Sequence, residues 1–323
     1  MKHQHKSAGG SAALAIALIA VAFVPAVPAR ADGERAASAL ASVVGVLPQW
    51  PPDARRIEEP EGSGVAVLDG RHVVTALHVV DKALSVRVQT ADGVIVAAEI
   101  VGRDQATDLA LLRIPEPLPP LAFAGEPRLG EEVCALGNAF GLGVSISCGT
   151  VSAVRRAGVG FNPIEDFVQT DAAVNPGASG GALVDAQGAL VGILSAIFTK
   201  QSDANIGVNF AVSAPLAERV VRELESTGRV RWLAAGMHLV AAPDKGETGR
   251  LGARVAALRE GTPAAVAGLR VGDVVLRAGD RPVHGPADFV SALAHVVAPG
   301  ELTVTILRDG AETSVALYFR EVR

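Results

Sequence analysis

A serine flanked by glycines, in the pentapeptide Gly177-Ala178-Ser179-Gly180-Gly181, has the clearest potential for chemistry. A serine hydroxyl becomes a good nucleophile only when a base takes its proton and a third group orients that base. The glycines allow a tight turn in which the backbone N–H groups of Gly177 and Ser179 can converge and stabilise an oxyanion. Taken alone, the pentapeptide is also typical of an ordinary glycine-serine loop.

A histidine and an aspartate further upstream could supply the base and its orienting group. His78 lies in an apolar run directly after an expected hairpin strand, and Asp108 precedes another apolar strand. The order histidine, aspartate, serine is that of chymotrypsin-like enzymes and differs from the orders on the α/β-hydrolase and subtilisin folds. The alternatives are a histidine that only packs in the core and an aspartate that only closes a turn.

Short apolar runs separated by turn residues predict the strands that would position these side chains. Asp69-Gly70 and Asp92-Gly93 are strong hairpin signals. Many short strands at close spacing favour a β-sandwich or barrel, and the proline-rich stretch 115–120 divides them into two units. The spacing of Leu216, Val220 and Leu224 predicts a helix that ends at Gly228. The expected strands are 64–68, 71–75, 84–90, 94–101, 109–114, 132–136, 144–154, 181–184, 190–196 and 207–212.

Residues 233–321 have the pattern of a separate, small α+β domain. Strands are expected at 253–258 and 271–277, and helices at 262–268 and 287–297. Two further alternating runs flank the turn pair Asp309-Gly310. The domain that contains the serine is therefore expected to span residues 61–228, followed by this second domain.

The first 31 residues have the features of a secretory signal peptide. Lys2 and Lys6 precede an apolar stretch at 12–24, and Ala29-Arg30-Ala31 fits a cleavage site before Asp32. An uncleaved membrane anchor is the alternative. Residues 32–60 lack sustained periodicity and are expected to form an N-terminal arm.

Export changes the interpretation of the two cysteines. In an oxidising compartment, Cys134 and Cys148 are more readily a disulfide than a catalytic or metal site. Two buried thiols are the alternative.

Composition excludes several classes of protein. The chain has 323 residues, of which 49% are hydrophobic and 20% charged, and this is too apolar for a disordered protein. A net charge of −5 without a Lys/Arg stripe argues against nucleic-acid binding. No apolar run approaches the roughly 20 residues of a spanning helix, which argues against a polytopic membrane protein. The histidines lack metal-ligand spacing, so we expect no metal. Gly141-Leu142-Gly143 lacks the third glycine of a dinucleotide-binding loop, and we expect no cofactor.

Five segments of the chain resemble motifs of the HtrA (Deg) family of exported trypsin-like serine proteases, and the resemblance covers about residues 61–320. The segments are Thr75-Ala76-Leu77-His78-Val79-Val80, Thr107-Asp108-Leu109-Ala110-Leu111-Leu112, Leu136-Gly137-Asn138-Ala139-Phe140-Gly141-Leu142 with Gly149-Thr150-Val151-Ser152, and residues 169–183. The resemblance implies a mainly β fold of two packed Greek-key β-barrels with the catalytic residues in the cleft between them. It implies that Ser179 attacks the scissile carbonyl, that His78 is general base and then acid, and that Asp108 fixes the imidazole. Gly177 and Ser179 would form the oxyanion hole.

The chain departs from the family pattern at two positions. Ala178 stands where the family usually has Asn or Asp, and Ala139 where it favours Pro. Because neither is one of the three catalytic residues, we expect altered loop stability or gating rather than lost activity.

The resemblance also places the substrate pocket. Its base would lie at Ala173, six residues before the serine, with Ile193 and Ser195 beside it. No acid is present at this base, so cleavage after small or medium aliphatic residues is expected rather than cleavage after Lys or Arg.

The second domain resembles the PDZ domain of this family, most clearly over residues 261–275. PDZ domains bind C-terminal peptides along a sheet edge, with a backbone loop that holds the carboxylate. That loop would fall at Ala235, Gly236 and Met237, where the usual pattern is poorly kept. A purely regulatory or structural domain is the alternative. The resemblance further implies a homotrimer.

Two hypotheses of function follow. The first is an exported, periplasmic serine endopeptidase that degrades unfolded or damaged envelope proteins and is regulated by its PDZ domain. The second is an inactive protease-fold chaperone or peptide-binding scaffold. The departure from the family pattern at Ala178 is the reason to retain this alternative.

Overall fold

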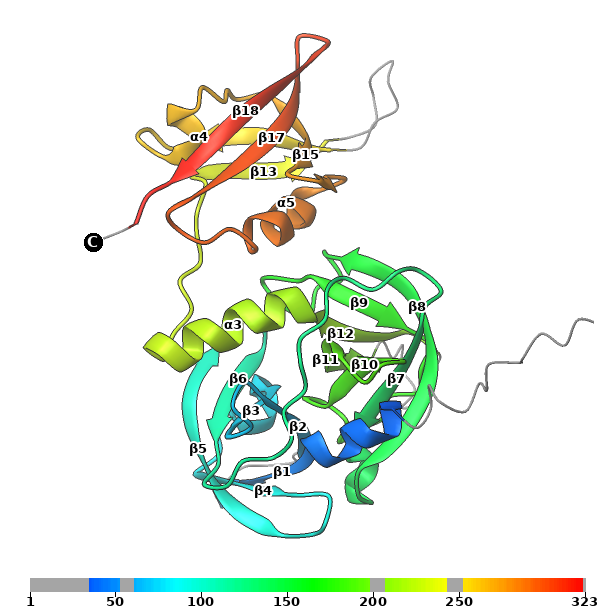
Figure 1. The fold of residues 1–323 in the computed structure, drawn as a ribbon. Helices are drawn as coiled ribbons and strands as arrows, with labels where there is room; N and C mark the ends of the chain where they lie inside the picture. The colour runs from blue at the N-terminus through cyan, green and yellow to red at the C-terminus, as the bar shows by residue number, and fades with distance from the viewer. Residues whose placement is uncertain (1–34, 53–60, 198–206, 243–251, 322–323) are drawn as a thin grey trace, which may run out of the picture.

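The computed structural model describes residues 35–52, 61–197, 207–242 and 252–321. The expected signal peptide, residues 1–31, lies outside the described residues. Within these ranges the chain forms two closed β-barrels followed by a separate sheet domain (Figure 1). The expectation of a mainly β chain with two barrels and a small α+β domain is confirmed.

The first barrel closes in the order β1-β2-β3-β6-β5-β4 with antiparallel neighbours. At its hairpin between β2 and β3, Gly70 has a φ of 80°, the left-handed conformation for which an Asp-Gly pair is suited. Its strands are β1 (Val43–Gln49), β2 (Gly62–Val67), β3 (His72–Ala76), β4 (Ser85–Gln89), β5 (Ile95–Asp104) and β6 (Leu109–Arg113).

The prediction that residues 32–60 form an arm is wrong at β1, and a boundary at residue 61 is too late. β1 pairs with both β2 and β4, so it is one of the six strands that close the first barrel. Val43, Val44 and Val46 are all fully buried, so the start of the strand lacks the alternation by which a half-buried strand is recognised. A short 3-10 helix, η1 (Ala39–Ser42), precedes it.

The second barrel repeats this architecture in the order β10-β11-β12-β9-β8-β7. The four-residue strand β9 was not expected from the sequence. The strands are β7 (Glu132–Gly137), β8 (Ser145–Arg156), β9 (Phe167–Thr170), β10 (Ala182–Asp185), β11 (Leu190–Ile197) and β12 (Asn209–Ser213), with the 3-10 helix η2 (Ala139–Gly141) after β7.

Helix α3 (Ala214–Thr227) covers the junction of the barrels. The predicted apolar face is confirmed, because Leu216, Val220 and Leu224 are each 0% exposed in a core that also includes residues of both barrels. Gly228 ends the helix in the left-handed conformation with a φ of 71°. One hydrophobic cluster therefore joins the two barrels and α3, and each barrel has a further cluster of its own.

The sheet of the last domain has the order β13-β14-β15-β17-β18, and β16 pairs with β15. Its core is built around Phe289, Val304 and Ile306. The strands are β13 (Met237–Ala241), β14 (Ala253–Leu258), β15 (Val274–Ala278), β16 (Arg281–Pro282), β17 (Gly300–Arg308) and β18 (Ala311–Phe319); the helices are α4 (Pro263–Val266) and α5 (Pro286–Leu293).

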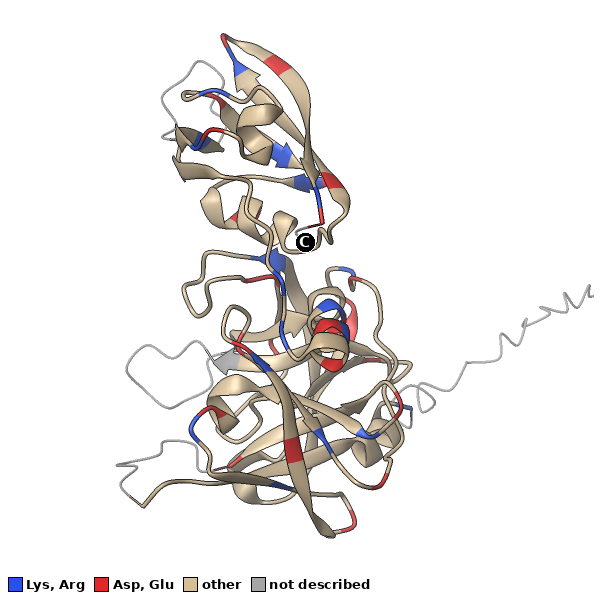
Figure 2. Cartoon of the chain, turned by 90° about the vertical axis from the view of Figure 1, so that its left-hand side faces the viewer, with Lys and Arg blue, Asp and Glu red and all other residues tan. Residues whose placement is uncertain are grey.

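Charged contacts join this domain to the barrels. Asp166 is 1% exposed and binds Arg281 (Nη1–Oδ1 2.8 Å) and His295 (Nε2–Oδ2 2.7 Å). Figure 1 shows α5 on the side of the domain that faces the barrels. In Figure 2, acidic and basic residues are intermingled over the chain rather than gathered by sign.

Candidate active site

Ser179 lies in a turn whose backbone is fixed by three hydrogen bonds to residues of the two barrels. The N–H of Ser63, in β2, donates to the Ser179 carbonyl at 2.8 Å. The Ser63 hydroxyl donates to the Gly177 carbonyl at 2.7 Å, and the N–H of Gly180 donates to the Leu194 carbonyl at 2.7 Å. The turn thus connects the first barrel to the second, and its serine is only 9% exposed.

Both glycines that follow the serine are required by close packing. A Cβ at Gly180 would lie 2.2 Å from the Ser63 carbonyl oxygen and 2.5 Å from Thr75 Oγ1. A Cβ at Gly181 would lie 2.3 Å from the carbonyl oxygen of Leu136. Because real Cβ atoms do not approach backbone this closely, glycine is the residue that fits at either position. The pentapeptide is therefore a tightly packed turn, and its Gly180 lies against the end of β3.

The backbone N–H groups of Gly177 and Ser179 have no acceptor within the described residues. The carbonyl of Pro176 accepts a hydrogen bond from the N–H of Phe140 at 2.8 Å. Since the peptide between Pro176 and Gly177 is planar and trans, its N–H points to the side opposite this carbonyl. Two neighbouring donors are therefore available to bind an oxygen, which is the composition of an oxyanion hole.

His78 lies on the one-turn helix α2 (Leu77–Val80), directly after β3. Its Nδ1 is 2.6 Å from Asp108 Oδ2, and its side chain is 43% exposed. The alternative that His78 only packs in the core is excluded by this exposure.

Asp108 holds both the imidazole and the backbone of α2. Its Oδ1 accepts the N–H of His78 at 2.9 Å, and its own carbonyl accepts the N–H of Leu77 at 2.8 Å. Asp108 has a φ of 58°, a left-handed conformation that Asp tolerates better than most residues. The aspartate therefore does more than close the turn between β5 and β6.

The structure brings the three predicted residues to one region. His78 and Asp108 are directly bonded. The Cβ position of Gly62 is 2.6 Å from the Val79 side chain and 3.2 Å from the Ser179 carbonyl, so α2 and the serine turn flank the same residue. Ser179 Oγ makes no hydrogen bond within the part of the chain that is described, and its contact with His78 stays a prediction.

The residues predicted for the substrate pocket do not all belong there. Ala173 is exposed, and its N–H donates to Ser147 Oγ at 3.1 Å, so β8 supports this segment. Ser195 is 7% exposed. Ile193 is 0% exposed and belongs to the core shared by the barrels, so its assignment to the pocket is wrong. The pairing of β11 with β12 shifts between Leu194 and Ala196, and this bulge breaks the alternation that would place positions 193 and 195 on one face.

Cys134 and Cys148 are joined by a disulfide in the structure, with a Cα–Cα distance of 4.0 Å. They are direct partners across β7 and β8. The described residues contain no group of three or more His, Cys, Asp or Glu side chains that could hold a metal ion.

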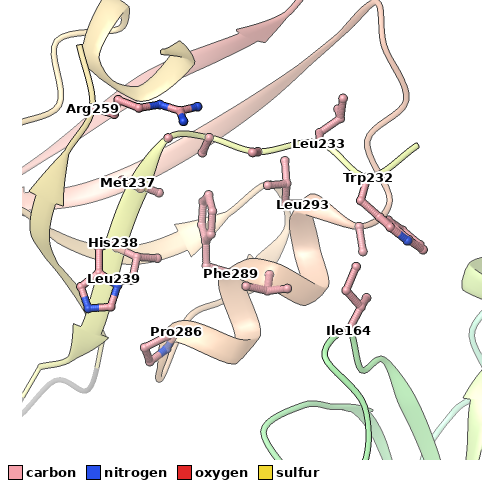
Figure 3. A pocket seen from close by; sticks show the side chains of 15 residues that line it. Ile164, Trp232, Leu233, Met237, His238, Leu239, Arg259, Pro286, Phe289 and Leu293 are labelled. Atoms are coloured by element: carbon pink, nitrogen blue, oxygen red, sulfur yellow. The ribbon is translucent and has the colours of Figure 1, made fainter. Parts of the chain in front are cut away.

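The loop predicted to hold a peptide carboxylate lies at the end of a groove between β13 and α5 (Figure 3). Gly236 has a φ of 80°, and the position of a Cβ there is filled by Thr262 at 2.2 Å. The groove has a volume of about 570 Å³ and is lined by Met237, Leu239 and Phe289, together with Ile164 of the second barrel. Of the predicted loop, Ala235, Gly236 and Met237 all line it.

Comparison with known proteins agrees with this architecture. Residues 62–193 match a trypsin-like peptidase domain, and residues 204–318 match a PDZ domain. The periplasmic serine endoprotease DegP of Escherichia coli (strain K12) is 34% identical over 270 residues, which are 80% of this chain and 57% of DegP. A probable DegP-like periplasmic endoprotease of Brucella suis is 36% identical over 80% of this chain and 52% of its own length. The chain thus spans little more than half the length of these relatives.

Solved structures cover the chain more completely. The HtrA-type protease AlgW with a tripeptide superimposes with a TM-score of 0.72 at 31% identity, covering 89% of this chain and 96% of AlgW. A serine endoprotease from Yersinia pestis gives a TM-score of 0.61 at 31% identity, over 90% and 98% of the two chains.

The two barrels and the turn between them define a trypsin-like peptidase domain, and the last domain is a PDZ domain. With this domain order and these relatives, the chain belongs to the HtrA/DegP family.

Two residues at the site were not found by sequence reasoning. The carboxylate of Asp104 accepts hydrogen bonds from the N–H and hydroxyl of Thr107, which precedes Asp108, and from the indole N–H of Trp232. Asp104 stands at the start of the turn with Thr107 three residues later, a local signal that could have been used. No local signal exists for Trp232, which lies 128 residues away.

Proposed function

We propose that the chain is a serine endopeptidase in which Ser179, His78 and Asp108 form the catalytic triad. The observation that carries the proposal is the His78–Asp108 pair beside a serine turn with two unused N–H donors. With Nδ1–H donating to Asp108, Nε2 of the neutral imidazole carries the lone pair needed by a base. The relatives named as serine endoproteases and the peptidase domain support the same reaction class.

In the proposed reaction, Nε2 of His78 takes the proton of Ser179 as Oγ forms a bond to the scissile carbonyl carbon. The carbonyl oxygen becomes an oxyanion that accepts hydrogen bonds from the N–H groups of Gly177 and Ser179. The imidazolium returns the proton to the leaving amine as the C–N bond breaks. Water then attacks the acyl-enzyme with the same general-base assistance and releases the acid. The chain needs no cofactor for these steps.

The pocket favours small or medium aliphatic residues before the scissile bond. Ala173 presents no carboxylate to a basic side chain, and the segment is supported by the neutral hydroxyl of Ser147. Unfolded or damaged proteins are the proposed substrates, because extended segments fit between two barrels more readily than folded ones do.

We further propose that the groove between β13 and α5 binds C-terminal peptides and that this domain regulates the peptidase. Support comes from the apolar lining and the loop at Gly236. Export to the periplasm with cleavage near Ala31, and assembly into a homotrimer, are proposed from the family. Among the described residues no helix is long and apolar enough to cross a membrane.

The experiment that tests the proposal is digestion of β-casein by the purified chain beside Ser179→Ala, with the cleavage sites mapped. Wild type should cleave after aliphatic residues, and the variant should lose activity by about 10⁶-fold. A phosphonate probe should label wild type only at Ser179. A wild-type chain that neither cleaves casein nor reacts with the probe, with a PDZ peptide present, would support the inactive scaffold instead.

A further inference from the structure

The turn that carries Asp108 is held by a buried carboxylate. Asp104 is the last residue of β5 and is 6% exposed. Its Oδ2 accepts the N–H of Thr107 at 3.1 Å and the hydroxyl of Thr107 at 2.6 Å. These bonds join Asp104 to Thr107, and Asp108 follows directly, so the position of Asp104 constrains the position of Asp108.

The other oxygen of this carboxylate is bound from outside the barrels. Trp232 lies in the segment that connects α3 to the PDZ domain, and its Nε1–H donates to Asp104 Oδ1 at 2.9 Å. A buried carboxylate oxygen without a donor destabilises the folded chain, because its lost hydration is not replaced. This bond therefore constrains the turn more than a surface contact would. The linker therefore completes the hydrogen bonding of the turn.

Trp232 is itself held at the domain junction. The guanidinium carbon of Arg219, in α3, lies 4.7 Å from the centroid of the indole ring. The same guanidinium donates to the Arg231 carbonyl at 3.0 Å and to the Ala294 carbonyl, at the end of α5. Through Arg219, residues of both domains therefore help to position the indole.

The opposite side of the turn is held by the second barrel. The side-chain amide of Asn162 donates to the Thr107 carbonyl at 3.1 Å, and the N–H of Ile164 donates to the Ala106 carbonyl at 2.9 Å. Figure 3 shows Ile164 and Trp232 at the same end of the groove. Three contacts therefore hold the turn, and of these only the bond from Trp232 comes from the domain linker.

We propose that Asp104 and Trp232 are positioning residues for the reaction: through the turn at 104–108 they align Asp108 with His78, so that the domain linker is part of the support of the active site. The proposal rests on the proposed function for its kinetic consequence. Its physical basis is that Asp108 uses its carbonyl and both carboxylate oxygens on α2, so a shift of the turn changes all three bonds together. Misplacement of a catalytic group by about 1 Å is enough to cost about 100-fold in rate.

The test replaces Trp232 by Phe in the full chain, which removes the N–H donor and keeps an aromatic ring for Arg219. We expect kcat to fall about tenfold with KM unchanged, the rate equivalent of one hydrogen bond to a charged group. The far-downfield proton resonance of His78 Nδ1–H should shift or broaden, and the acid limb of the pH–rate profile should move to lower pH. Asp104→Asn should show the same changes more strongly, because Asp104 accepts three of the bonds.

Asp185→Asn is the matched control. Asp185 closes the turn between β10 and β11 with the same chemistry, since its Oδ1 accepts the N–H groups of Gln187 and Ala189, each at 2.9 Å. This variant should leave kcat and the His78 resonance unchanged. An unchanged resonance and rate in Trp232→Phe would overturn the proposal. If the wild-type chain is inactive, the proposed function fails while the resonance still tests the alignment, so the two failures are distinguishable.

Discussion

At the scale of single residues, the site depends on groups with more than one partner. Asp108 binds the imidazole and caps α2 at once, and the Ser63 hydroxyl donates to Gly177 while it accepts the N–H of Asn138 at 2.8 Å. Ala178 is 4% exposed and packs against Gly137, so a small apolar side chain fits this position. The departure from the family at Ala178 is therefore accommodated by packing.

Asp108→Asn should lower kcat by about 10⁴-fold with little change in KM. An amide retains the shape of the carboxylate but favours the wrong imidazole tautomer and does not stabilise the imidazolium. Steady-state kinetics on a peptide with an aliphatic residue before the scissile bond would measure this. Asp185→Asn again serves as the control, and equal activity of Asp108→Asn and wild type would contradict the assigned role.

At the scale of elements, most strands bounded by turn residues were predictable even where they are fully buried, whereas β1 and β9 were missed. The hairpin at Asp69-Gly70 and the apolar face of α3 follow directly from sequence patterns. The strand β1 was missed because its first residues are buried on both faces, and β9 because Gln169 and Thr170 interrupt its apolar run. Ile193 was misplaced because a bulge is a tertiary feature with no local signature. The contact of Trp232 with Asp104 depends on how two domains pack, which local patterns cannot reveal.

The pairing of β7 with β8 also makes a chemical prediction. Because Cys134 and Cys148 face each other across these strands, the denatured, unreduced protein should have no titratable thiol. The measurement is a thiol assay in denaturant with and without prior reduction, in which reduction should release two thiols per chain. Two reactive thiols before reduction would show that the bridge does not form.

At the scale of the whole molecule, a buried carboxylate secures the PDZ domain to the barrels. Burial opposes ionisation of Asp166, but hydrogen bonds from His295 and Arg281 outweigh it and hold the pKa of this carboxyl well below its ordinary value. Ser213 Oγ donates to the same group at 2.7 Å. Since the pKa in the folded chain lies below that in the unfolded chain, the stabilisation is present above the unfolded pKa and is lost as pH falls through the folded pKa.

Asp166→Asn should therefore destabilise the chain by about 3 to 5 kcal/mol at neutral pH, because it leaves the largely buried guanidinium of Arg281 without its counter-ion. The difference from wild type should persist down to about the ordinary carboxyl pKa of 3.8 and shrink in more acidic solution. Chemical unfolding of both proteins across this pH range is the measurement. The exposed ion pair of Glu218 with Arg222 provides the comparison, since Glu218→Gln should cost less than about 1 kcal/mol. A constant difference at every pH would contradict the assignment.

The groove beside α5 is lined by residues of two domains. Ile164 belongs to the second barrel, yet it lines the same hollow as Met237 and Phe289. An excised PDZ segment would lack this side chain. For the peptide binding proposed above, selections carried out on the isolated fragment should therefore rank sequences differently from selections on the intact chain. Peptide preference at this groove should therefore be measured on the full chain, in which Ile164 completes the lining.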